Sequence, residues 1–191
     1  MRDELVAETE ALVYGDVADL SVWGGAVIDR RAYRRLEGLQ RQVADDPTVA
    51  VLAGGTGDDR EGFFVRPTVA VGSDPTHEIF TREYFAPFLA VRVYDDDAPG
   101  GVEEALSLAG ASPYALTGAV FGREQGWLAH ATDRLRCAAG NLYVNDRPTG
   151  AVVGQQPERD QLASHREPAG CQSLASPLTL HSCSRTSMSW T

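Results

Sequence analysis

The feature that most constrains this chain is the regular alternation of apolar and amphipathic segments after Pro87. Three apolar runs, residues 87–95, 116–122 and 138–146, are separated by helix-like segments at 100–110 and 123–137. The apolar runs have the length and composition of buried strands, and the segments between them suit helices. A β-α-β-α-β order with short connections predicts parallel strands whose two faces are covered by helices. We therefore expect an α/β fold with a mostly parallel sheet.

The first half of the chain predicts two helices followed by two strands. Residues 3–14 carry acids in their first turn, where the helix dipole favours them. Residues 30–45 place four large side chains on one stripe, Tyr33, Leu36, Leu39 and Val43. Strands are expected at 48–55 and 62–71, with the turn GTGDDREG between them. Pro67 lacks an amide donor, so we expect it at a bulge or a sheet edge.

Composition excludes several classes of function. The chain has 191 residues, enough for one domain with a core, and a net charge of −10 that argues against nucleic-acid and anionic-membrane partners. No apolar run reaches the roughly 18 to 20 residues of a membrane span. The acidic start MRDELVAETEAL is unlike a secretion signal, and three cysteines without CxxC spacing predict neither a disulfide framework nor a metal site. We therefore expect a cytoplasmic protein.

The composition changes after Pro157. Residues 158–191 contain seven serines and two of the three cysteines, and their three acids and three arginines cancel. They show no sustained helical or strand period. We expect one domain over residues 1–157 and a divergent, disordered tail over 158–191.

Several segments resemble one family in the right order. GFFVRPTV is similar to the glycine-aromatic-x-x-Pro-Thr strand of aldehyde dehydrogenases, and REYFAPFLAV to their Glu-x-Phe-x-Pro element, with Ala86 where glycine is usual. YALTGAVFG, the following helix and GNLYVND resemble the last βαβ unit of that catalytic domain. GNLYVNDRPTGAVVGQQP is close to the anchor loop of the L-glutamate γ-semialdehyde (1-pyrroline-5-carboxylate) dehydrogenases. The resemblance implies NAD as cofactor and a small aldehyde as substrate.

The resemblance assigns four residues to binding. Glu83 matches the acid that accepts hydrogen bonds from the nicotinamide ribose, and Phe85 matches the aromatic beside the nicotinamide. Gly150 and Ala151 match the loop whose backbone amides hold the α-carboxylate of the substrate. From the residues alone, Glu83 also fits a solvated surface acid, Phe85 fits core packing, and Gly150 fits a simple Pro-Thr-Gly turn.

Catalytic and metal residues are not expected among the 191. The family's reaction needs a cysteine thiolate upstream of the Glu-x-Phe-x-Pro element, together with a general-base glutamate and a dinucleotide motif, and none of these is matched here. Cys137 fits a buried small hydrophobe better than a nucleophile. His77 and His130 have no ligand-spaced partner, so no metal site is expected.

Three interpretations of the chain remain open. It is a piece of a truncated or split dehydrogenase without activity alone, a non-catalytic interaction module, or a degenerate product. After GQQP the sequence also departs from the family's Phe-Gly-Gly segment and from its subunit-pairing strand, so we do not expect the family's oligomer.

Overall fold

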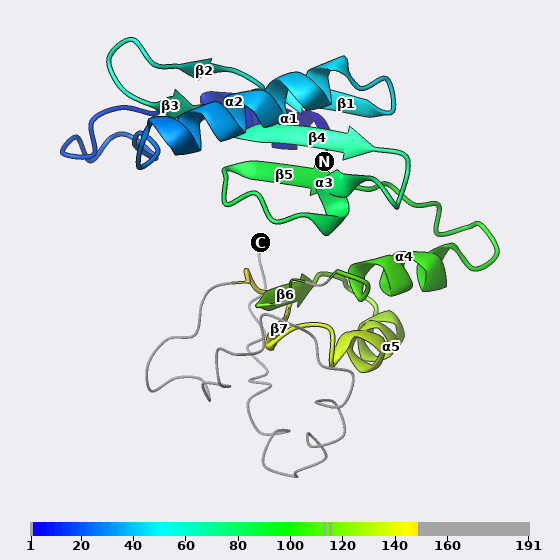
Figure 1. Ribbon diagram of the computed structural model, residues 1–191. Coiled ribbons are helices and arrows are strands. Elements are labelled where there is room, and N and C mark those ends of the chain that lie inside the picture. Colours follow the sequence, from blue (N-terminus) through cyan, green and yellow to red (C-terminus); the bar gives the residue numbers. More distant parts are fainter. Residues whose placement is uncertain (1, 113, 115, 149–191) are drawn as a thin grey trace. The chain divides into compact units, whose positions relative to one another are not determined.

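The computed structural model describes residues 2–112, 114 and 116–148 (Figure 1). The chain divides into two compact units, Met1–Tyr94 and Asp95–Thr191, and each is described by itself. Within the described part of the chain, no helix is long and apolar enough to cross a membrane. The predicted tail, 158–191, lies outside the described residues.

A three-stranded sheet of mixed direction forms the centre of the first unit. Its strands are β1 (Val49–Ala53), β4 (Thr68–Gly72) and β5 (Phe88–Val91), in the order β1-β4-β5. β5 runs parallel to β4, with Val69 opposite Leu89, whereas β1 is antiparallel to β4 and shifts register between Val51 and Ala53. Ala70, on the central strand, is completely buried.

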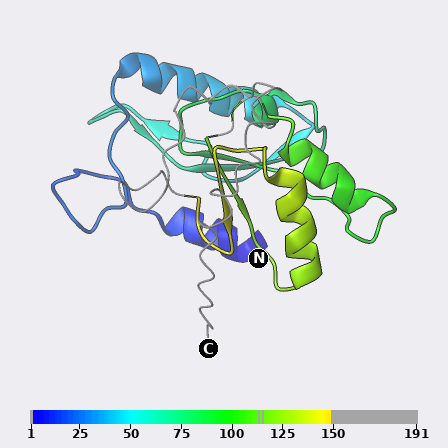
Figure 2. The same cartoon turned by 90° about the horizontal axis from the view of Figure 1, so that it is seen from below.

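Two helices cover opposite faces of this sheet, α1 (Arg2–Ala11) and α2 (Arg30–Asp45) (Figure 2). Asp29 is the N-cap residue of α2, and its carboxylate accepts a hydrogen bond of 2.7 Å from the amide of Ala32. The stripe predicted from the sequence is buried in full, each member at most 6% exposed: Tyr33, Leu36, Leu39 and Val43. The spacing of these residues therefore identified the core face of α2 correctly.

The strand predicted over residues 62–71 is two strands. β3 (Phe64–Val65) pairs with β2 (Gly57–Asp58) in an antiparallel hairpin, and β4 begins only at Thr68. The break contains Pro67, which has no N–H to continue a ladder. The carbonyl oxygen of Pro67 also approaches Gly54, where φ is +70° and a Cβ atom would lie 1.8 Å from that oxygen. This close approach requires glycine at position 54.

The second unit contains the β-α-β arrangement predicted from the sequence. β6 (Thr117–Val120), α5 (Gln125–Leu135) and β7 (Asn141–Val144) follow one another, and β6 and β7 pair in parallel. α4 (Gly101–Ala109) precedes them, and α4 and α5 share a core with the strands. Four side chains, each at most 7% exposed, form that core: Leu106, Val120, Ala131 and Leu135.

The α/β class is confirmed, since parallel pairs occur in both units and helices cover both faces of the first sheet. The antiparallel pairs β1-β4 and β2-β3 were not predicted. A short helix, α3 (Glu78–Thr81), lies just before β5 and leads into the Glu-x-Phe-x-Pro segment (Figure 1).

Candidate functional site: the α3–β5 connection

Both residues predicted to bind the cofactor line one cavity of about 350 Å³. It lies in the first unit, where α3 passes into β5. Glu83 and Phe85 are contributed by the connecting segment, and the walls are completed by Ile79, Arg82, Tyr84, Ala86, Phe88 and Ala90. The structure thus brings Glu83 and Phe85 together, and their role in binding stays a prediction.

Phe85 is held in an unusual backbone conformation. Its φ is +49°, in the left-handed region that costs a residue with a side chain about 1–2 kcal/mol. The flanking backbone is fixed on its C-terminal side, where the amide of Phe88 donates to the Ala86 carbonyl at 2.8 Å and the amide of Thr68 donates to the Pro87 carbonyl at 2.9 Å. The Phe85 ring is 83% exposed, which excludes core packing for this side chain. Strain of this kind is found preferentially at functional sites.

Tyr84 points the other way, into the core. Its ring centroid lies 5.7 Å from that of Phe88, and the guanidinium carbon of Arg82 lies 5.5 Å from the Tyr84 ring centroid. Its hydroxyl is buried and has no hydrogen-bond partner within the described chain, and burial raises the pKa of Tyr84. Arg35 of α2 donates a hydrogen bond to the Tyr84 carbonyl oxygen. Tyr84 therefore anchors the segment, while its two neighbours face outward.

The Glu83 carboxylate is exposed and available to a ligand. Among the described residues it has neither a hydrogen-bond nor an ion-pair partner. The nearby Arg82 instead forms an ion pair with Glu78, with 3.7 Å between Nη1 of Arg82 and Oε2 of Glu78. An ionised carboxylate next to an open cavity can accept hydrogen bonds from two hydroxyl groups. Together with the exposed ring of Phe85, this is a suitable wall for a ribose and a flat heterocycle.

Sequence reasoning missed the inward anchor Tyr84 and the supporting contacts of Arg35 and Arg82. An extended chain would turn Tyr84 away from its two neighbours, which is the signal the sequence offered, but the left-handed φ of Phe85 departs from that conformation. The contact from Arg35, 49 residues earlier, could not be read from that pattern.

The two residues predicted to bind substrate, Gly150 and Ala151, lie outside the described residues. The structure describes the strand that leads to them and the residues up to Pro148. After β7, Asn145 adopts φ +54°, and its side-chain oxygen accepts a hydrogen bond of 2.8 Å from the amide of Gly122. Its own amide donates to the Val120 carbonyl at 2.8 Å, so Asn145 joins the carboxyl ends of β6 and β7. The sequence analysis did not single out Asn145.

Both histidines in the described part of the chain are paired with a carboxylate. His77 pairs with Asp46 at 3.0 Å, and His130 pairs with Glu103. Cys137 is half-buried, two residues beyond the end of α5, and its assignment as a small packing residue stays a prediction.

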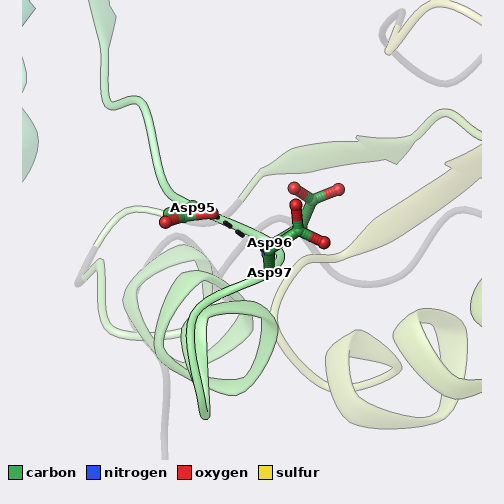
Figure 3. A group of neighbouring side chains, drawn as sticks. All are labelled: Asp95, Asp96 and Asp97. Carbon is green, nitrogen blue, oxygen red and sulfur yellow. Dashed lines mark hydrogen bonds between the residues drawn. The ribbon is translucent and has the colours of Figure 1, made fainter.

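Within the described residues, one group of three carboxylates could reach a common ion, that of Asp95, Asp96 and Asp97 (Figure 3). All three side chains are exposed, and one oxygen of each lies within 4.8 Å of the others. Figure 3 shows them along one turn, where the amide of Asp97 donates to the Asp95 carboxylate at 3.1 Å. The same contacts occur in an ordinary acidic turn.

Comparison with known proteins identifies the family of the chain. The model of the aldehyde dehydrogenase family matches residues 1–158. The chain therefore belongs to the aldehyde dehydrogenase family. It is 43% identical over 157 residues to the probable delta-1-pyrroline-5-carboxylate dehydrogenase of Schizosaccharomyces pombe, covering 82% of this chain and 28% of that protein. It is 39% identical over 159 residues to the mitochondrial enzyme of Homo sapiens, with the same coverage.

Solved structures give the same family. The delta-pyrroline-5-carboxylate dehydrogenase from Mycobacterium tuberculosis bound with NAD is 48% identical and has a TM-score of 0.73, covering 82% of this chain and 28% of that one. The betaine aldehyde dehydrogenase of Staphylococcus aureus in complex with NAD⁺ is 26% identical and has a TM-score of 0.65, and the match covers 78% of this chain and 29% of that one. NAD is thus the cofactor of these relatives. The chain spans a little over a quarter of the length of the relatives it matches.

Proposed function

We propose that this chain supplies the nicotinamide-ribose wall of an NAD-dependent dehydrogenase that oxidises L-glutamate γ-semialdehyde to L-glutamate. The observation that supports this most is the shared cavity of Glu83 and Phe85, with an unpartnered carboxylate beside an exposed ring. The names of the relatives support the substrate. We further propose that the complete reaction takes place in the cytoplasm, although some relatives are named mitochondrial.

Each proposed role follows from the chemistry of its residue. Glu83 accepts hydrogen bonds from the ribose hydroxyls and so fixes the rotation of the nicotinamide ring. Phe85 presents an apolar surface next to that ring and excludes water there. Gly150 and Ala151 offer backbone amides to the α-carboxylate of the substrate. NAD, when bound, accepts the hydride released from the oxidised aldehyde carbon.

We propose that the 191 residues have no activity by themselves. The covalent route requires a reactive cysteine thiolate, and no cysteine of the 191 residues matches the family's nucleophile. Mixing the purified chain with NAD and the semialdehyde should give no NADH absorbance above a blank. Steady production of NADH that depends on chain concentration would overturn this part of the proposal.

Binding by the wall is tested separately from turnover. At millimolar NAD, the amide NMR signals of residues 82–86 should shift, because only one wall contacts the cofactor and affinity is weak. Glu83→Gln removes a charge-assisted acceptor and should weaken binding about tenfold. The matched control is Glu8→Gln on α1, also exposed, which should leave the titration unchanged. Equal titration curves for wild type and Glu83→Gln would contradict the assignment of Glu83.

A second candidate function is a non-catalytic module that pairs with an intact relative. It is favoured by exposed apolar side chains in the connection between α1 and α2, where Val17 is 72%, Leu20 97% and Ile28 93% exposed. Native mass spectrometry of the chain mixed with a full-length 1-pyrroline-5-carboxylate dehydrogenase tests this. A complex that disappears with Leu20→Ser and Ile28→Ser would support the module, and absence of any complex would remove it.

A further inference from the structure

His77 connects two elements that are distant in sequence. One ring nitrogen, Nε2, lies 3.0 Å from a carboxylate oxygen of Asp46, the C-cap residue that follows α2. The other, Nδ1, accepts a hydrogen bond of 3.1 Å from the amide of Ile79 and thereby caps the N-terminus of α3. The side chain of His77 is only 15% exposed.

These two contacts select one form of the imidazole ring. The amide of Ile79 is a donor, so Nδ1 must be without a proton; in the neutral ring the proton is then on Nε2. Nε2–H in turn faces the Asp46 carboxylate, which is an acceptor. The other carboxylate oxygen of Asp46 is occupied by the amide and hydroxyl of Thr48, at 2.7 and 2.6 Å. Asp46 is therefore fixed in place, and its carboxylate favours the His77 tautomer with the proton on Nε2.

The capped helix α3 leads directly into the segment that carries Glu83 and Phe85. α3 has only four residues, and a helix of one turn is not stable without outside contacts. Ile79 is 5% exposed and packs in the main core, yet both Ile79 and Arg82 line the cavity. The amide of Arg82 donates to the Glu78 carbonyl at 2.9 Å, closing the helix immediately before Glu83.

We propose that His77 is a positioning residue: its Nε2–H tautomer, imposed by Asp46, caps α3 and so fixes the segment that presents Glu83 and Phe85. That this segment binds NAD rests on the function proposed above. The tautomer and the cap do not depend on it.

Protonation of His77 should weaken this arrangement. A proton on Nδ1 removes the acceptor for the Ile79 amide, while the contact of Nε2 with Asp46 remains. Two carboxylates interact electrostatically with the ring, Asp46 next to the C-terminus of α2 and Asp74 in the turn before α3. Glu78 is already bonded to Gln42 and Arg82.

The experiment uses the whole ¹⁵N-labelled chain. Histidine ring ¹H–¹⁵N correlations identify the tautomer, and the signal of His77 is assigned by its loss in His77→Asn. We expect Nε2–H in the wild type. In Asp46→Asn the new amide group, with its oxygen held by Thr48, turns an N–H donor toward Nε2. The His77 proton should therefore move to Nδ1, and hydrogen-exchange protection of the Ile79 amide should fall about fivefold.

Substitutions at His77 separate capping from simple packing. His77→Ala should lower Ile79 protection about fivefold and shift the amide signals of Glu83 and Phe85. Asparagine is itself a good N-cap residue. His77→Asn should therefore keep the hydrogen-exchange protection of the Ile79 amide within about twofold, although the contact with the Asp46 carboxylate is lost. His130→Asn, which disturbs the comparable pair with Glu103 in the second unit, is the matched control and should leave Ile79 unchanged.

Three results would overturn the proposal: an Nδ1–H tautomer in the wild type, an unchanged tautomer in Asp46→Asn, or wild-type Glu83 and Phe85 signals in His77→Ala. The tautomer is measured on the wild type, and a variant serves only to assign the His77 signal, so a misfolded Asp46→Asn or His77→Ala cannot leave the idea untested. In the NAD titration, His77→Ala should bind about fivefold more weakly than wild type. If NAD shifts no signal in the wild type, the function proposed above fails, while the tautomer and protection data still decide the role of His77.

Discussion

The hydroxyl of Thr68 lies at the centre of a buried polar network, and its removal gives a quantitative test of the fold. Thr68 is 2% exposed. Its Oγ1 accepts hydrogen bonds of 3.1 Å from the amide of Gly55 and from the side-chain amide of Gln40, and it donates to the Arg66 carbonyl at 3.1 Å. The network ties α2 to the β1–β2 turn and to the start of β4.

Thr68→Val replaces this hydroxyl by a methyl group of similar size, so the change is mainly one of hydrogen bonding. The Gly55 amide has no other hydrogen-bond partner within the described chain. Gln40 keeps only two long bonds, 3.3 Å to the Thr56 carbonyl and 3.4 Å to the Arg66 carbonyl. Leaving a partly buried donor without its acceptor costs about 1–3 kcal/mol, and we expect a loss of about 2 kcal/mol in the free energy of unfolding.

The assay is urea unfolding followed at the amide signals of Val69 and Ala70, because these report the first unit separately from the second. With a urea dependence of about 1–3 kcal/mol per molar, the midpoint should fall by roughly 1 M. The control is Thr56→Val in the same connection, which is exposed and should change stability by less than about 0.5 kcal/mol. Equal midpoints for Thr68→Val and Thr56→Val would refute the reasoning.

Three further changes test the packing and the electrostatics of the first unit. Gly54→Ala must adopt a left-handed φ and also displace a backbone carbonyl, so it should cost more than about 2 kcal/mol, measured as a fall in the urea midpoint. Leu36→Ala, at 1% exposed, should cost about 2–5 kcal/mol in thermal or urea unfolding, whereas Leu20→Ala, at 97% exposed, should be nearly neutral. Hydrogen bonds from Thr48 and then His77 lower the pKa of Asp46 from 3.8 to about 2, so its contribution to stability is complete above pH 3.8 and is lost as the pH falls toward 2. Asp46→Asn should remove this part of the acid dependence of the unfolding midpoint, and an unchanged slope would show that another group causes it.

The position of the candidate site was predictable, but its geometry was not. The Glu-x-Phe-x-Pro pattern placed Glu83 and Phe85 before a strand, and the structure has them on one cavity there. The left-handed φ of Phe85 depends on the fixed backbone that follows it, and the inward turn of Tyr84 depends on the core it enters. The pairing of His77 with Asp46 spans 31 residues and left no periodic signal in the sequence.

Elements that depend on a local pattern of residues could be identified before folding was considered. The spacing of Leu36, Leu39 and Val43 identified the buried face of α2, and the apolar runs identified the parallel pair β6-β7. The division of residues 62–71 at Pro67 and the antiparallel direction of β1 relative to β4 were not predictable and are seen in the folded chain. Periodicity records which face of an element is buried, whereas pairing direction, breaks and side-chain contacts depend on neighbours that meet only when the chain has folded.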